Sequence, residues 1–190
     1  MSIQERKVLL VGNTEVGKTS IIYNMSKKEE QTKPTIGAHT FTIKMKSNES
    51  DVTLNVWDTA GQDEYKCFIP IFAQGVDVAV IVFDVTNSES YDSVQIWVAT
   101  IKNEYLINDI YVAANKSDLV FDKDDLKEIS CFLEEHSIPM YFTSAVSGKN
   151  IPKLFQDIAD LPFPEKVAEK AIEFNEPDFS REKSKCCLLI

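Results

Sequence analysis

The chain has 190 residues, of which 44% are hydrophobic and 26% charged, a balance that is ordinary for one globular domain with a single core. Its net charge is -10, and neutralising nucleic-acid phosphates needs a basic face, so we expect no nucleic acid among its partners. No run of about eighteen apolar residues occurs, and residues 1–6 lack the pattern of a signal peptide, so we expect a cytosolic protein.

The first predicted elements are a buried strand at residues 7–11 and a helix at residues 17–25. Between them, residues 12–19, hereafter the phosphate loop, fit the pattern G-x-x-x-x-G-K-[ST] in the strand-loop-helix context that this pattern needs. In such a loop, backbone N–H groups and the helix N-terminus bind phosphate, Lys18 bridges the β- and γ-phosphates, and the Thr19 hydroxyl ligates Mg²⁺. Isolated matches also occur in turns that bind nothing.

The next two predicted strands, residues 39–46 and 52–57, are joined by the polar residues 47–50 and should pair as an antiparallel hairpin. Asp58 follows the second of them, which puts its carboxylate where ligands bind in an open parallel sheet. We expect Asp58 to hold Mg²⁺ through a water, and the Gly61 N–H to meet a γ-phosphate. A plain strand-to-loop turn capped by Asp58 is the alternative.

The remaining sequence alternates helical and strand patterns. This alternation predicts an α/β fold with a six-stranded, mostly parallel sheet, one antiparallel hairpin strand and about five flanking helices. The further strands are predicted at residues 77–83, 110–114 and 140–142, and the further helices at residues 63–72, 90–104, 123–136 and 151–159.

Asn115 and Asp118 follow the predicted strand at residues 110–114. A carboxylate at Asp118 can accept both N1–H and the exocyclic amine of guanine, a pair of donors that adenine does not offer. A simple Asn/Asp turn would also explain this segment taken alone. Its position after the phosphate loop and Asp58 favours the base, so the ordered motifs predict a guanine nucleotide, GTP or GDP, with Mg²⁺.

The ordered set of residues 12–19, 57–62, 115–118 and 143–145 resembles the small GTPases of the Ras superfamily, over residues 6–161. Within that superfamily the chain is most similar to the Rab family, through Thr35-Ile36-Gly37, Trp57 ahead of Asp58, and paired cysteines near the end. The resemblance implies a P-loop small G domain at residues 1–162. It also implies a switch that exchanges GDP for GTP, hydrolyses GTP slowly, and recruits effectors to a membrane in the GTP state.

The resemblance also assigns roles to residues. Thr35 completes a Mg²⁺ site with Thr19 and Asp58, and Gln62 orients the attacking water. The backbone of residues 143–145, hereafter the base loop, reads the guanine carbonyl, although Val146 stands where a lysine usually follows. The implied nucleotide-binding residues are Asn13, Thr14, Glu15, Val16, Gly17, Lys18, Thr19, Ser20, Thr35, Gly61, Asn115, Lys116, Asp118, Ser144 and Ala145.

Other positions depart from the family pattern. Thr14 and Glu15 replace small residues beside the phosphates, which leads to the hypothesis of weak intrinsic hydrolysis with limited help from an activating protein. Side chains that simply point to solvent are the alternative. Residues 26–33 lack the aromatics that usually cover the nucleotide, which predicts faster nucleotide loss. His39 and Thr40 replace an acidic and an aromatic residue, so no effector can be assigned from a subgroup.

Residues 163–190 are predicted to be a flexible tail with a prenylation motif. Cys186 and Cys187 resemble the doubly lipidated Rab tails, while the last four residues also fit C-a-a-X; two lipids anchor stably and one only marginally. Cys67 and Cys131 lie far apart, so neither a disulfide framework nor a zinc site is supported. We expect a location on the cytoplasmic face of endomembranes, cycling with the cytosol.

The partners implied by the resemblance are an exchange factor, a GTPase-activating protein, prenylation machinery, a GDP-dissociation inhibitor and effectors, acting on a monomer. Two functions remain open. One is an active GTPase switch of vesicle trafficking, which Gln62 and Thr35 favour. The other is a nucleotide-bound, poorly hydrolysing membrane scaffold, which Thr14 and Glu15 make credible. An ATP-using enzyme is a distant third, because it has no use for Asp118.

Overall fold

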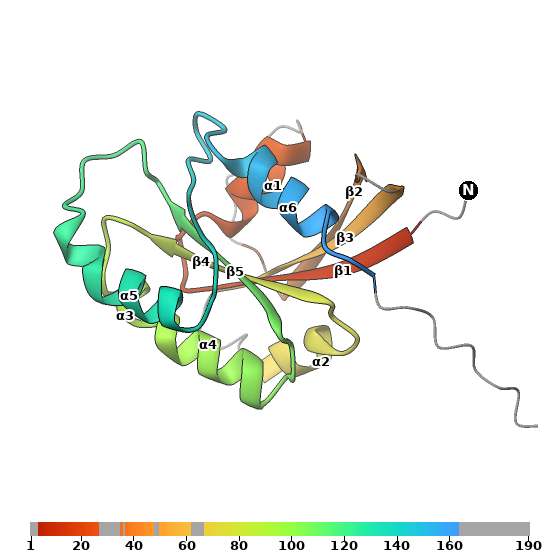
Figure 1. Ribbon diagram of the computed structural model, residues 1–190, viewed down its shortest axis with the longest axis horizontal. Helices are drawn as coiled ribbons and strands as arrows, with labels where there is room; N and C mark the ends of the chain where they lie inside the picture. The colour runs from red at the N-terminus through yellow and green to blue at the C-terminus, as the bar shows by residue number, and fades with distance from the viewer. Residues whose placement is uncertain (1–3, 27–34, 36, 48–49, 62–66, 164–190) are drawn as a thin grey trace, which may run out of the picture.

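The computed structural model describes residues 4–26, 35, 37–47, 50–61 and 67–163. Its centre is a six-stranded sheet in the order β2-β3-β1-β4-β5-β6 (Figure 1). The β2–β3 pair is antiparallel and the other neighbouring pairs are parallel, which confirms the predicted fold class. The strands are β1 (Gln4–Val11), β2 (Ala38–Lys46), β3 (Asp51–Thr59), β4 (Val78–Asp84), β5 (Asp109–Asn115) and β6 (Met140–Phe142).

Helices cover both faces of the sheet. Successive strand side chains point to opposite faces, so Val8 and Leu10 pack with α1 and α6, while Leu9 and Val11 pack with α2, α4 and α5. Figure 1 shows the two helical layers on either side of the strands. The helices are α1 (Lys18–Ser26), α2 (Ile69–Ala73), α3 (Ser88–Asp92), α4 (Val94–Asn103), α5 (Lys127–Glu135), preceded by the 3-10 turn η2 (Asp124–Leu126), and α6 (Ile151–Ala159).

Central and edge strands differ as their sequences predict. Every residue of β4 is buried, as expected for an apolar strand covered on both faces. The edge strand β2 instead buries Phe41 and Ile43 and exposes Thr40, Thr42 and Lys44 on the alternate positions. One face of β2 is therefore open to partners, while β1 and β4 form a rigid floor for the loops at their ends.

The parallel register brings the carboxyl ends of four strands to one edge of the sheet. Asp58 on β3 pairs with Leu10 on β1, and Asp84 on β4 pairs with Asn115 on β5. The phosphate loop follows β1 at the same edge, and the base loop follows β6. Segments that are far apart in the sequence are thus placed side by side, where an open parallel sheet binds ligands.

Several predicted boundaries were wrong. Asp58 and Asn115 lie inside strands rather than after them, because pairing with the neighbouring strands continues through both residues. The predicted helix at 90–104 is divided at Ser93, whose hydroxyl donates to the Ser90 carbonyl and competes with the helical backbone. Helix α2 spans Ile69–Ala73, with a proline in its first turn, and the start of the helix predicted at 63–72 lies outside the described residues. Most of the predicted tail lies outside the described residues.

Arg6 holds the end of α6 against the start of β1. Its side chain is 3% exposed and donates to the carbonyls of Ile158, Leu161 (2.8 Å) and Pro162 (3.3 Å), while its guanidinium lies 4.1 Å from the Phe163 ring centre. These carbonyls lie at and beyond the helix C-terminus, where a cation is favourable. Burial lowers the pKa of Arg6, and the nearby Asp77 and Asp109 oppose this shift.

None of the helices within the described ranges has the length and apolar character needed to cross a membrane.

Candidate functional site

The phosphate loop bends so tightly that two of its positions accept only glycine. A Cβ on Gly12 would lie 2.1 Å from the Val82 carbonyl oxygen, and one on Gly17 would lie 2.3 Å from Nδ2 of Asn115. Both glycines have a positive φ, +140° and +94°, which other residues rarely adopt. The close approach of loop, β4 and β5 therefore fixes the path that the loop N–H groups follow.

Lys18 lies under this loop. Its side chain is 5% exposed, and Nζ donates to the carbonyl oxygens of Gly12 (2.9 Å) and Asn13 (2.7 Å). A Cβ on Gly61 would lie 2.5 Å from the Asn13 carbonyl oxygen and 2.6 Å from the Lys18 Nζ, so the end of β3 packs tightly on the loop. The structure thus brings together Lys18 and Gly61, two residues predicted to bind phosphate, and keeps a buried positive charge at the loop.

Three oxygen-bearing side chains meet at the start of α1. The Thr19 hydroxyl donates to Oδ2 of Asp58 at 2.7 Å, and the Thr35 hydroxyl lies 3.0 Å from that of Thr19 and 3.3 Å from the same carboxylate oxygen. Asp58 is fully buried, and its Oδ1 has no hydrogen-bond partner within the described part of the chain. Buried carboxylates need a partner, so this arrangement fits a small cation with oxygen ligands, such as Mg²⁺.

Burial raises the pKa of Asp58, whereas the bonds from Thr19 and Thr35 and the charge of Lys18 act to lower it. The raised pKa has a simple cause, because a buried carboxylate loses its hydration. A bound divalent cation would supply the opposite charge and favour the ionised form. The three residues predicted as metal ligands are therefore brought together in a setting suited to a cation.

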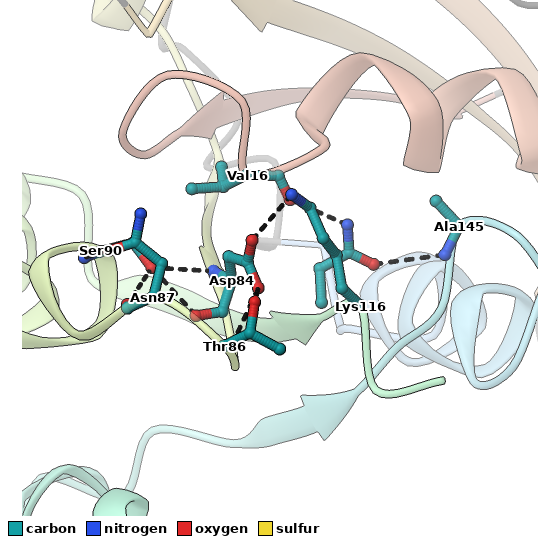
Figure 2. Close-up of polar contacts among 8 residues, drawn as sticks. Val16, Asp84, Thr86, Asn87, Ser90, Lys116 and Ala145 are labelled. Atoms are coloured by element: carbon teal, nitrogen blue, oxygen red, sulfur yellow. Dashed lines mark hydrogen bonds and ion pairs between the residues drawn. The ribbon is translucent and has the colours of Figure 1, made fainter. Parts of the chain in front are cut away.

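Asn115 joins the two loops of the site. Its Nδ2 donates to the Val16 carbonyl at 2.8 Å, and its Oδ1 accepts the Thr143 hydroxyl (3.3 Å) and the Ala145 N–H (3.2 Å). Figure 2 shows Val16 and Ala145 at the two ends of this bridge. Asn115 is 1% exposed, so water could not easily replace these bonds if the amide were removed. The bridge fixes the distance between the phosphate loop and the base loop.

Lys116 pairs with Asp84, a residue that the sequence analysis missed. The Lys116 Nζ lies 2.7 Å from Oδ2 of Asp84, whose Oδ1 accepts the N–H and hydroxyl of Thr86 (Figure 2). Although burial acts to raise it, these bonds leave the pKa of Asp84 below its ordinary value. Asp84 ends the buried strand β4 as Asn115 ends β5, and this shared position was the signal available in the sequence.

The base loop is buried at one end and open at the other. Ser144 is fully buried, and its hydroxyl accepts the Ser147 N–H at 3.0 Å, while Val146 is 85% exposed. Asp118 is exposed at the same edge, where the Ser117 N–H donates to the Thr143 carbonyl at 3.0 Å. A carboxylate that faces solvent beside an ordered loop is free to accept donors from a base.

Thr14 and Glu15 are both exposed, and Glu15 has a φ of +61°, in the left-handed region. Asn13 instead turns inward, where its Oδ1 accepts the Ser93 hydroxyl (3.1 Å) and the Trp97 indole N–H (3.3 Å). Asn13 thereby ties the phosphate loop to α4. The exposure of Thr14 and Glu15 agrees with the solvent-facing alternative for their side chains.

A cavity of about 1010 Å³ lies beside the phosphate loop, between Gly61, α3 and α4. Its lining residues include Thr14 from the phosphate loop, the apolar Ile96 and Trp97 of α4, and Glu104. Asp58, Asn115 and Asp118 are not among its lining residues. The cavity therefore adjoins the phosphate-loop side of the predicted site, through Asn13, Thr14 and Gly61, and does not include the predicted base ligands.

Some predicted site residues cannot be placed. Gln62, predicted to orient the attacking water, and the cysteines Cys186 and Cys187 lie outside the described residues. Their roles remain predictions from the sequence.

Comparison with known proteins decides the family. Residues 7–162 match the family model described as "Ras family". The chain belongs to the Ras family. This Ras-family protein is 31% identical over 188 residues to "Ras-related protein RABF2a" of Arabidopsis thaliana, covering 95% of the chain and 94% of that protein.

It is 30% identical over 186 residues to "Ras-related protein Rab-32D" of Dictyostelium discoideum, covering 92% of the chain and 82% of that protein. It is also 33% identical over 155 residues to "Putative ras-related protein Rab-5B" of the same organism, covering 80% and 72%. The predicted Rab-type small GTPase is confirmed, and the scaffold alternative is not favoured.

Proposed function

We propose that this Rab-like GTPase binds GTP and GDP with Mg²⁺ at the carboxyl edge of its sheet, and that hydrolysis at this edge releases effectors from a membrane. The observation that carries the proposal is the cluster of Thr19, Thr35 and Asp58 beside the buried Lys18. A buried carboxylate oxygen without a hydrogen-bond partner among the described residues supports a cation at this point.

The phosphates would lie along the phosphate loop, against the N–H groups of Asn13 to Ser20 and the N-terminus of α1. Lys18 would exchange its bonds to the loop carbonyls for bonds to phosphate oxygens. Because a charged donor to a charged acceptor is stronger than a charged donor to a carbonyl, this exchange favours the bound state.

Mg²⁺ would be held by the hydroxyls of Thr19 and Thr35 and by Asp58. Such a cation neutralises charge on the phosphate oxygens during phosphoryl transfer. Thr35 comes from the segment between α1 and β2. In the GTP state, its contact with Thr19 and Asp58 would order that segment, and loss of this contact after hydrolysis would release it.

Gln62 would orient the attacking water, and the Gly61 N–H would face the γ-phosphate. Support for this step comes from the sequence match at Gln62 and from the tight packing of Gly61 on Asn13 and Lys18. No covalent intermediate is required, because positioning and charge stabilisation supply most of the catalysis in this reaction class.

The guanine base would be bound by Asp118, with Lys116 beside it and the backbone of Ser144 and Ala145 at its carbonyl. The support is the bridge at Asn115, which keeps the base loop at a fixed distance from the phosphate loop. Asp84 would hold Lys116 in place through their ion pair.

Membrane attachment would come from lipids on Cys186 and Cys187, and the proposed cycle involves an exchange factor, an activating protein, a GDP-dissociation inhibitor and prenylation enzymes. The motif at the end of the chain supports this part of the proposal. We place the protein on the cytoplasmic face of endomembranes, as a monomer that cycles with the cytosol.

A single-turnover experiment tests the proposed function. The protein is loaded with radiolabelled GTP and Mg²⁺, and phosphate release and nucleotide dissociation are followed together. We expect phosphate release to outrun dissociation, and Gln62→Leu to slow release at least about tenfold without changing dissociation.

Gln74→Leu is the matched control, because Gln74 is an exposed glutamine near α2. Intact GTP leaving the wild-type protein before any phosphate is released would overturn the hydrolytic switch.

A further inference from the structure

Asn24 lies on α1, outside every motif that the proposed function uses. Its Nδ2 donates to the Ala145 carbonyl at 3.0 Å, across 121 positions of sequence. Helix α1 carries Lys18 and Thr19 at its first turn, so one helix contacts the proposed phosphate and Mg²⁺ site at its start and the base loop near its end. Asn24 is half-buried, and its amide is the part of α1 that reaches this loop.

Ala145 is consequently held from both sides of its backbone. Its N–H donates to Oδ1 of Asn115 at 3.2 Å, and its carbonyl accepts from Asn24. Asn115 in turn donates to the Val16 carbonyl at 2.8 Å. The bonds form a closed path from the phosphate loop through Asn115, Ala145 and Asn24 back to the helix that follows the loop.

The base loop also packs directly on the Asn24 amide. A Cβ at Gly148 would lie 3.1 Å from Oδ1 of Asn24, and Gly148 has a φ of +77°. The Gly148 N–H donates to the Ser144 carbonyl at 2.8 Å, so this glycine closes the turn that carries Ser144 and Ala145. The amide of Asn24 therefore contacts the beginning and the end of the turn.

We propose that Asn24 is a positioning residue for guanine recognition: by holding the Ala145 carbonyl, it keeps the base loop aimed at the 6-oxo group of the base. This inference rests on the proposed function, because it requires that the base loop reads guanine. The Ala145 carbonyl belongs to the planar peptide unit that also carries the Val146 N–H, so holding this carbonyl also holds that N–H in the turn. Without the Asn24 donor, the Ala145 backbone would keep its bond to Asn115, and the turn would keep its internal bonds.

The test follows dissociation of three fluorescently labelled nucleotides from the full chain. GDP has the 6-oxo acceptor, 6-thioguanosine diphosphate replaces it with a sulfur that accepts weakly, and inosine diphosphate keeps it but lacks the 2-amine. The variant is Asn24→Asp, which keeps the size of the side chain and removes the donor; Asn24→Ala serves if the added charge prevents folding.

We expect Asn24→Asp to accelerate GDP dissociation about three- to tenfold, the effect of one net hydrogen bond. Dissociation of inosine diphosphate should accelerate by the same factor, because the amine that it lacks would bind Asp118 and not the base loop. The dissociation rate of the 6-thio nucleotide should change less than about twofold, because its sulfur already makes a weak contact with the base loop that Asn24 positions. The discrimination between GDP and its 6-thio analogue is the readout.

Ser26→Ala is the matched control. Ser26 is on the same helix and donates to the Tyr23 carbonyl at 3.3 Å, and it makes no hydrogen bond to the base loop within the described part of the chain. An equal acceleration for all three nucleotides would mean that Asn24 merely supports α1, and unchanged rates would mean that it does nothing; either result overturns the inference. A wild-type protein that does not prefer GDP over ADP would instead overturn the proposed function.

Discussion

The phosphate end and the base end of the proposed site are built on different physical principles. At the phosphate end, charged groups are buried: Lys18 is 5% exposed and Asp58 is fully buried. At the base end, the buried Asp84 is paired with Lys116, the neutral amide of Asn115 connects the two loops, and the carboxylate of Asp118 faces solvent. Charge therefore dominates the phosphate end, and amide geometry supports the base end. Substitutions at the two ends should consequently have different effects on the protein.

Asp118→Asn should produce the largest change, because it exchanges an acceptor for a mixed donor and acceptor. We expect preference to shift from GDP towards xanthosine diphosphate by about 10- to 150-fold, the worth of a charged hydrogen bond. Competitive displacement of labelled GDP measures the shift, with the exposed Asp125→Asn as control. An unaltered preference for guanine would refute the assignment of Asp118 to the base.

Asp84→Asn should have a smaller effect that depends on pH. Because the pKa of Asp84 is lowered in the folded state, the carboxylate adds stability above the ordinary carboxyl pKa of about 4, and this is lost as pH falls through the lowered value. We expect a cost of about 1 kcal/mol at pH 7, since Lys116 is partly exposed.

Urea unfolding of wild type and Asp84→Asn at pH 7 and pH 3 measures this difference. The difference in stability between the two proteins should be smaller at the lower pH. A gap that stays constant between pH 7 and pH 3 would contradict an electrostatic role for the pair.

Replacing Thr14 and Glu15 together by glycine should have the smallest effect. If their side chains crowd the water or an incoming partner, single-turnover hydrolysis should rise about threefold, which corresponds to ~0.7 kcal/mol. The control is Glu128→Gly or another exposed position away from the phosphate loop. An unchanged rate would support the alternative, in which the exposed side chains face solvent and only the loop N–H groups matter.

The sequence predicted the sheet, and it placed the proposed ligands relative to the strands, because both depend on local patterns. Apolar or alternating runs locate β1, β3 and β5. The phosphate-loop pattern after β1 contains Lys18, Asp58 is the next-to-last residue of β3, and Asn115 ends β5. The contacts that hold these residues in place are long-range, such as Asp84 with Lys116 and Asn13 with Trp97. They depend on strand register and helix position, which one sequence does not specify.

The predicted strand and helix boundaries were wrong for the same reason. Asp58 belongs to β3 because β1 and β2 continue to pair alongside it. Ser93 divides the predicted helix because its hydroxyl bonds to both Ser90 and the distant Asn13. In both places a tertiary partner changed what the local pattern favoured.

The hydrogen bonds by which Arg6 holds the end of α6 against the start of β1 have a mechanical consequence. Arg6 and the phosphate loop are carried by one strand, with Arg6 near the start of β1 and Gly12 just past its end, about 20 Å away at the usual rise per residue. A lipid-anchored tail would begin beside Arg6, at the end of the sheet opposite the nucleotide edge. Tension on that tether would act first on the bonds between Arg6 and the carbonyls of Leu161 and Pro162, at the end of β1 opposite the phosphate loop.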